Sequence, residues 1–193
     1  MRSLFAVVLL VAAPAFAQGY SRPYSEWDRR PLEGIYLGIA GGGQLMIASD
    51  DQGFSDNAFG YDGELRLGYS FGVPFALYAS ASFDGANFGN GFSDAFLRTE
   101  MFAVFLQYHL YARPDLMVYV RGGLGVGVSA DVTFDGSSAA GIAGQGGLGF
   151  EFRVAQRLYL APEFFYKNMN LNGGSGGGAD VQMLGVQLGL IYY

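Results

Sequence analysis

The amino-acid sequence predicts an all-β protein, an eight-stranded antiparallel up-and-down β-barrel that spans a membrane. Apolar residues recur at every second position through eight successive stretches, the period that gives a β-strand one apolar face. The connections between these stretches alternate between short and long. Charged residues make up only 15% of the chain, whereas a soluble domain has about 25%.

The last stretch shows the alternation most clearly. After residue 180, Leu184, Val186, Leu188 and Leu190 alternate with residues of mixed type. A strand at the edge of a sheet leaves unpaired backbone groups unless it finds a second neighbour. We therefore expect this strand to pair with the first one and to close the sheet into a barrel.

Seven further stretches carry the same pattern. In the second of them, Leu65 and Leu67 share one face, while Glu64 and Arg66 share the other. The connections near residues 73, 114 and 156 are short, and those near 51, 90, 137 and 175 have about a dozen residues each, as in bacterial outer-membrane barrels. The expected strands are 34–47, 59–71, 75–84, 96–110, 116–128, 140–154, 158–168 and 180–193.

Three residues interrupt the pattern. Arg98 and Glu100 share the parity of the apolar residues of their strand, so either they lie beyond the membrane or a β-bulge shifts the register. Pro162 has no backbone N–H to offer a central strand, and we expect a local bulge there.

The N-terminus indicates export. Arg2 precedes an apolar stretch over residues 4–13, and Ala15-Phe16-Ala17 has the small-x-small pattern of a signal-peptide cleavage site. A membrane anchor is the alternative, but the stretch is shorter than the roughly 20 apolar residues that a spanning helix needs. The expected divisions are a signal peptide (1–17), a periplasmic segment with the only tryptophan, Trp27 (18–33), and the barrel (34–193).

The composition of the two strand faces predicts which one contacts lipid. A soluble eight-stranded barrel such as a lipocalin turns its apolar face inward. Here the polar face consists mainly of Gly, Ala, Ser and Tyr, which suits a narrow lumen better than a surface in water. Aromatic residues of the apolar face gather near both strand ends, as in the girdles of membrane barrels. They are Tyr61, Tyr69, Phe71, Phe75, Phe83, Tyr108, Tyr166 and Tyr192.

From residue 34 onward, the chain resembles the outer membrane protein β-barrel domain family, the small OmpA/OmpX-like barrels. Its end is similar to the family's assembly signal, with Met183 in place of the usual polar residue. The resemblance implies a bacterial outer-membrane location, insertion by the barrel assembly machinery, and contact with outer-membrane lipid and lipopolysaccharide. The residues that match the signal are Gly185, Leu188, Leu190 and Tyr193.

Charged residues of the polar face form the candidate functional site. Four are acidic and four are basic, and buried charges must be paired. An eight-stranded barrel is just wide enough for side chains to fill, so we expect a network that closes the lumen. A narrow gated path for water or small ions and a catalytic acid–base pair are the alternatives. The residues are Asp62, Glu64, Arg66, Arg121, Glu151, Arg153, Glu163 and Lys167.

No catalytic, cofactor-binding or metal-binding site is predicted. Lipid A deacylases place a Ser two residues from their His, but Tyr111 holds that position after His109, the only histidine. Gly144-x-Gly146-x-x-Gly149 fits a dinucleotide fingerprint by letter, yet a strand-like segment follows where a helix is required. The chain has no cysteine, which excludes disulfides, thiolate metal sites and thiol catalysis.

Net charge excludes one further class of function. The formal charge of −6 argues against nucleic-acid binding, which needs a basic surface.

We expect a monomeric integral protein of the outer membrane with a structural or surface-interaction role. The alternative is a narrow channel or transporter for small solutes or hydrophobic molecules.

Overall fold

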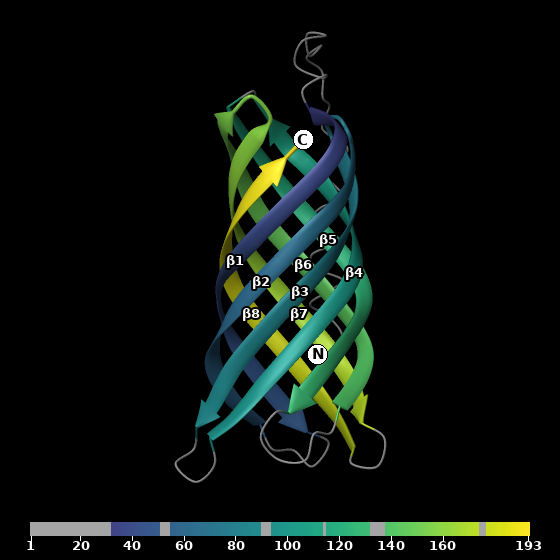
Figure 1. Ribbon diagram of the computed structural model, residues 1–193, viewed down its shortest axis with the longest axis vertical. Coiled ribbons are helices and arrows are strands. Elements are labelled where there is room, and N and C mark those ends of the chain that lie inside the picture. The colour runs from purple at the N-terminus through teal and green to yellow at the C-terminus, as the bar shows by residue number, and fades with distance from the viewer. Residues whose placement is uncertain (1–31, 51–54, 90–93, 114, 132–137, 174–176) are drawn as a thin grey trace.

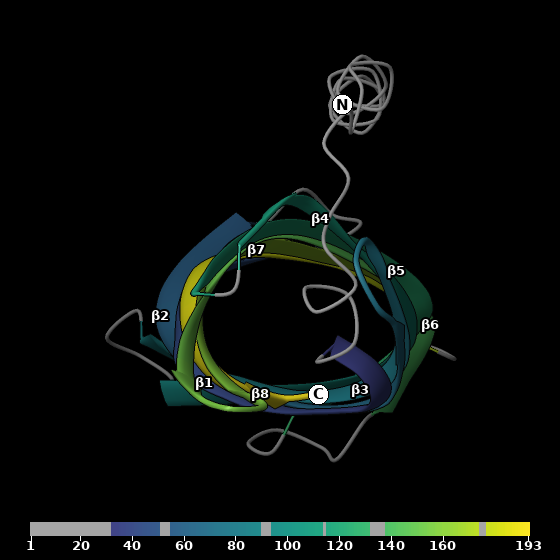
Figure 2. The ribbon, with the colours of Figure 1, turned by 90° about the horizontal axis from the view of Figure 1, so that it is seen from above.

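The computed structural model describes residues 32–193 except 51–54, 90–93, 114, 132–137 and 174–176. Its eight strands form one closed antiparallel barrel in sequence order (Figure 1). Seen along the barrel axis, the strands make a continuous ring (Figure 2). The predicted fold class and strand number are confirmed. The strands are β1 (Glu33–Asp50), β2 (Ser55–Phe71), β3 (Phe75–Gly89), β4 (Asp94–Ala112), β5 (Leu116–Asp131), β6 (Ser138–Ala155), β7 (Leu158–Gly173) and β8 (Gly177–Tyr192).

Barrel closure rests on pairing between the first and last strands. Leu37 lies opposite Tyr192, and the pairing continues without a break to Asp50 opposite Ala179. This is the closure that the alternation in the last strand predicts. We call the end with the connections at 72–74, 113–115 and 156–157 the turn end, and the opposite end the loop end. Among the described residues, no helix is long and apolar enough to cross a membrane.

The two faces of the wall are assigned as predicted. Large apolar side chains on the outer face are exposed, for example Leu67 at 62%, Leu124 at 70% and Ile142 at 74%. Polar side chains on the inner face, such as Glu64 and Lys167, are buried. An apolar exterior around a polar interior is the reverse of a lipocalin and fits a barrel solvated by lipid.

The strands are longer, and the loop-end connections shorter, than the sequence predicts. Strands run from 15 to 19 residues, and only residues 51–54, 90–93, 132–137 and 174–176 separate them at the loop end. The expectation of loops with about a dozen residues is therefore wrong. Outward polar residues such as Asn57 and Asn170 continue the backbone pairing beyond the apolar band, where alternation no longer marks a strand.

Register shifts lie at two places that the sequence does not predict. The pairing of β4 runs unbroken through Arg98 and Glu100, which contact each other on the outer face, so no bulge explains their parity. Pro162 pairs opposite Leu188 in an unshifted ladder, so the expected bulge there is wrong. The shifts occur instead at the turn end, after His109 in the β4–β5 ladder and after Arg153 in the β6–β7 ladder.

Inward glycines allow aromatic rings to lie against the wall. A Cβ atom on Gly149 would lie 2.4 Å from Cζ of Tyr119, and one on Gly185 would lie 2.6 Å from Cζ of Phe165. Such distances leave no space for a side chain, so these positions require glycine. Gly149 ends the dinucleotide-like pattern, which lies within β6 and has no helix after it.

Candidate functional site

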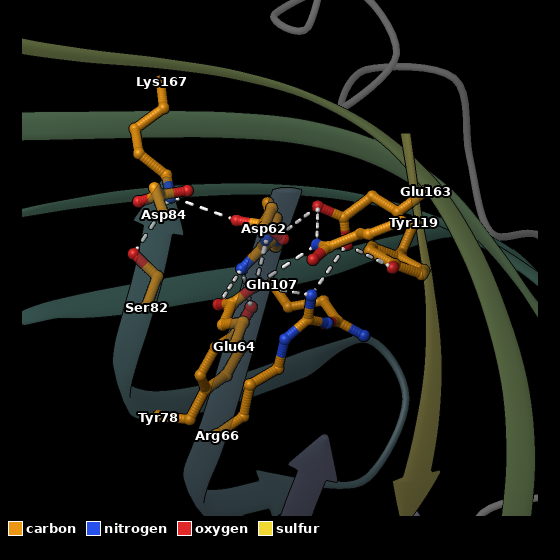
Figure 3. A network of polar contacts seen from close by, with 12 residues as sticks. Asp62, Glu64, Arg66, Tyr78, Ser82, Asp84, Gln107, Tyr119, Glu163 and Lys167 are labelled. Atoms are coloured by element: carbon orange, nitrogen blue, oxygen red, sulfur yellow. Dashed lines mark hydrogen bonds and ion pairs between the residues drawn. The ribbon is translucent and has the colours of Figure 1, made fainter. Parts of the chain in front are cut away.

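Polar side chains inside the barrel form three groups between the loop end and the turn end, and Figure 3 shows residues of the first two of them with Gln107. Residues from as many as five strands meet in one group, because strands of a tilted barrel bring distant sequence positions to the same height. The loop-side group is Lys167, Asp62, Asp84, Ser82, Gln44 and Thr99. The central group is Glu64, Arg66, Arg121, Glu163, Tyr78, Tyr119 and Gln187. The turn-side group is Glu151, Gln107, His109, Tyr193 and Tyr36.

The central group is a balanced cluster of two acids and two bases. Arg121 on β5 binds Glu64 on β2 through two hydrogen bonds of 2.6 and 2.8 Å, and its Nε atom lies 2.6 Å from Glu163 on β7. Arg66 contacts the same two carboxylates at 2.9 and 3.2 Å. Tyr119 donates to Glu163 at 2.6 Å. Each charge therefore meets at least two opposite charges, which offsets the cost of removing all four from water.

The loop-side group places two carboxylates around one ammonium. Lys167 Nζ on β7 lies 2.9 and 2.8 Å from the two oxygens of Asp84 on β3, across the barrel. It also donates to Ser82 at 3.0 Å and lies 3.2 Å from Asp62 Oδ1. Gln44 donates to Asp84 at 3.1 Å. Asp84 is thus the main counter-ion, while Asp62 Oδ2 is a buried atom with no hydrogen-bond partner among the described residues.

This asymmetry predicts unequal effects of two matched substitutions. Asp84→Asn should lower the free energy of unfolding by about 2 kcal/mol, because it removes a carboxylate that accepts several charge-assisted hydrogen bonds. Asp62→Asn should cost less than about 1 kcal/mol, because one contact is lost and a second acid remains beside Lys167. Urea unfolding in lipid bilayers measures both. Equal losses would contradict the assignment of Asp84 as the main partner.

The turn-side group holds the last residue inside the barrel. The hydroxyl of Tyr193 lies 2.8 and 2.9 Å from the two oxygens of Glu151. Gln107 donates to Glu151 at 2.7 Å, and His109 Nε2 lies 3.2 Å from it. The ring of Tyr36 packs edge-on against that of Tyr193 at 5.3 Å. These contacts close the turn end with buried aromatic rings around one carboxylate.

Seven of the eight charged residues predicted for the lumen lie there and are buried; Arg153 does not. Arg153 is exposed at the turn end and donates to the backbone oxygens of Ala155 and Gln156. Arg153 has the inward parity of Glu151 and pairs opposite Tyr159, but it lies at the rim of the barrel, in the last pair before the register shift to Ala155. Placing Arg153 in the network was therefore wrong.

The sequence analysis also missed several residues that form hydrogen bonds or ion pairs with the charged residues of the lumen. Asp84 lies on the predicted polar face of its strand, next to Ser82 in the alternation, and that parity was a usable signal. The uncharged partners Gln107, Gln187 and Tyr119 share the parity of the inward charges, but their sequence positions do not indicate which charge they meet.

The residues predicted as an assembly signal divide between the two faces. Leu188 and Leu190 point outward, with 53% and 43% of their surface exposed. Gly185 and Tyr193 point inward, and the side chain of Tyr193 is fully buried. Leu188 and Leu190 therefore form one outward pair, while Tyr193 belongs to the turn-side group.

His109 lies among a carboxylate, an amide, a phenol and a backbone oxygen at the turn end. Its Nε2 atom faces Glu151, Gln107 and Tyr193, and its Nδ1 atom lies 3.3 Å from the backbone oxygen of Pro74. No aliphatic hydroxyl is among these partners, and the ring is buried. Within the part of the chain that the structure describes, no three His, Cys, Asp or Glu side chains form a group that could hold a metal ion.

Solved structures of several bacterial outer-membrane and surface proteins are similar to this chain. The chain is 13% identical to Neisserial surface protein A, with a TM-score of 0.58 over 81% of this chain and 98% of that one. Ail of Yersinia pestis is 17% identical, with a TM-score of 0.46 over 81% and 99% of the two chains. OprG of Pseudomonas aeruginosa is 18% identical, with a TM-score of 0.41 over 83% and 97%. At this identity, the likeness to Neisserial surface protein A shows the fold alone.

A search of the curated proteins found no match to this chain. Residues 3–192 match the family described as the outer membrane protein beta-barrel domain. The match spans nearly the whole chain and agrees with the closed eight-stranded barrel and its apolar exterior. The chain therefore belongs to the outer membrane protein beta-barrel domain family.

Proposed function

We propose that this protein is a closed barrel of the bacterial outer membrane with a structural or surface-interaction role. The observation that carries the proposal is that side chains join distant walls of the barrel in all three polar groups. Lys167 meets Asp84 from β7 to β3, and Arg121 meets Glu64 from β5 to β2. Gln107 meets Tyr193 at the chain's end, 3.3 Å apart. We infer that a lumen crossed in this way is closed to solutes.

The same network supports a role as a rigid carrier of surface segments. Ion pairs that join opposite strands resist changes in strand position, because separating the partners would leave an unpaired charge buried in the lumen. The strand ends at the loop end are then held at fixed spacing, which suits contact with a partner at the cell surface. Outer-membrane lipid and lipopolysaccharide are the proposed surroundings, and nucleic acid is not a proposed partner. We take the functional unit to be a monomer.

Export and assembly complete the proposal. A cleaved signal peptide over residues 1–17 and a periplasmic segment over 18–33 remain predictions from the sequence, because residues 1–31 lie outside the described part of the chain. The outward pair Leu188 and Leu190, with inward Gly185, is the proposed contact for the barrel assembly machinery. Tyr193 is also part of this proposed contact, and in the finished barrel it belongs to the turn-side group.

Planar-bilayer recording tests the closed lumen directly. Protein purified from outer membranes, with heat-modifiable gel migration as the folding control, is expected to give no discrete conductance steps. The reason is that the polar side chains fill the lumen instead of lining a water-filled passage. Reproducible steps from the folded form would contradict the proposal and would favour a channel with the lumen charges as its selectivity residues.

A further inference from the structure

The inner wall changes character on the loop-end side of Lys167. On β7 the next two inward residues after Lys167 are Met169 and Leu171, and their partners on β8 include Val181. Met183 lies opposite Lys167 itself. All four apolar side chains are at most 1% exposed. The polar loop-side group is thus followed, toward the loop end, by a layer of packed apolar side chains.

Other strands contribute to the same layer. Met46 on β1 lies opposite Met183 and two residues beyond Gln44, which binds Asp84. A Cβ atom on Gly127 of β5 would lie 2.9 Å from the Met169 sulfur, so this thioether reaches the neighbouring wall over a position without a side chain. We call this set the apolar layer. Its members are Met46, Ala86, Ala143, Met169, Leu171, Val181 and Met183.

The apolar layer differs physically from the polar groups beneath it. Methionine is flexible and fills irregular space, so three methionines can close a narrow lumen without gaps. Water and ions enter an apolar constriction only at high cost, and hydrophobic constrictions close channels by dewetting. Thr99 and Ser129, which lie opposite each other on β4 and β5, are uncharged polar residues on the same inner face. The hydroxyl of Thr99 is engaged with Asp84 at 3.5 Å.

We propose that the first barrier to ions and charged reagents from the loop end is the apolar layer, and that the ion pairs close the lumen only behind this barrier. The inference rests on the proposed function, because it names the part of the closed lumen that excludes solutes. It predicts that an ion pair can be weakened without admitting reagents from the loop end. It also predicts that making the apolar layer polar admits them.

A single engineered thiol can report access to the lumen, because the chain has no cysteine. Gln145 is the position of choice: it is buried, lies opposite Lys167 and has a side-chain amide with no hydrogen-bond partner among the described residues. Gln145→Cys thus removes no hydrogen bond that would distort the network. A charged methanethiosulfonate reagent, applied to the folded protein in bilayers from the loop end, converts the thiol to a mixed disulfide and releases methanesulfinate. Labelling after unfolding gives the reference rate.

Three variants of the Gln145→Cys protein test whether the apolar layer or the ion pairs exclude the reagent. Met46→Ser with Met169→Ser should raise the labelling rate at least about tenfold, because serine hydrates the apolar layer. Met117→Ser is the matched control, a buried inward methionine on the turn-side part of β5. It should leave the rate within about threefold, as should Asp84→Asn, which weakens the Lys167 pairing but keeps the apolar layer.

The outcomes separate this inference from the proposed function. If Asp84→Asn admits the reagent and the double methionine variant stays protected, the ion pairs are the barrier and the inference is overturned. Rapid labelling of the Gln145→Cys protein without Asp84→Asn or the methionine substitutions also overturns the inference. If the double variant does not reach the heat-modifiable folded form, Met169→Ser alone serves in the same assay. Conductance steps from the unaltered protein would instead refute the proposed closed lumen.

Discussion

Replacing Arg121 with leucine is expected to lower the free energy of unfolding by about 3–5 kcal/mol. The guanidinium binds Glu64 twice and Glu163 once, and it also lies 3.2 Å from the hydroxyl of Tyr78. Leucine leaves both carboxylates with Arg66 as their remaining cation in a buried lumen. Most of the lost stability arises because the buried carboxylates of Glu64 and Glu163 lose a counter-ion, and less arises from the lost hydrogen bonds themselves.

Arg153→Leu is the matched control for this experiment. Arg153 was predicted to lie in the lumen but is exposed and contacts only turn carbonyls among its described partners. An exposed substitution of this kind should change stability by less than about 0.5 kcal/mol. Equilibrium unfolding by urea in lipid vesicles, followed by heat-modifiable migration, measures both. If the two variants lose the same stability, the central group is not a buried cluster.

Replacing Leu67 with arginine is expected to cost about 2–4 kcal/mol, the range for a cation on the lipid face near the middle of a membrane barrel. Leu67 is 62% exposed on the outer face of β2, so in a bilayer its side chain lies against lipid. An arginine there must be desolvated or must distort the bilayer to reach water.

Asn57→Arg supplies the control on the same face of the same strand. Asn57 points outward near the loop end of β2, beyond the apolar side chains. Near the membrane boundary an arginine costs only about 0–1 kcal/mol. Unfolding in bilayers should therefore distinguish the two variants clearly. Unimpaired folding of the Leu67→Arg protein would mean that this face does not contact lipid.

The alternation of residues was enough to predict the barrel. In β2, one face carries Leu65 and Leu67 and is assigned to lipid, while the other carries Glu64 and Arg66 and is assigned to the lumen. Eight strands with this pattern close the sheet. The ends of the strands were not predictable in this way. Beyond the membrane both faces can be polar, so pairing continues through Asn57 and Asn170 without a sequence pattern that marks it.

The sequence predicts which charged residues face the lumen better than it predicts which of them pair with one another. Parity alone placed seven of the predicted charged residues inside. Which acid meets which base depends on strand tilt and shear, because these decide that Lys167 on β7 faces Asp84 on β3. Parity does not say where the lumen ends: Arg153 keeps the inward parity and pairs opposite Tyr159, yet it lies at the turn-end rim and is exposed. The position of this rim has no clear mark in the sequence.

A double-mutant cycle between Lys167 and Asp84 tests most directly whether side chains meet across the lumen. Unfolding free energies in bilayers are measured for the unaltered protein, Lys167→Met, Asp84→Asn and the double variant. The contact at 2.8 Å predicts a coupling energy of at least about 1.5 kcal/mol, with the double variant losing less than the sum of the single losses. Additive losses within about 0.5 kcal/mol would mean that the two walls are not joined there, and would contradict a closed lumen built on cross-barrel pairs.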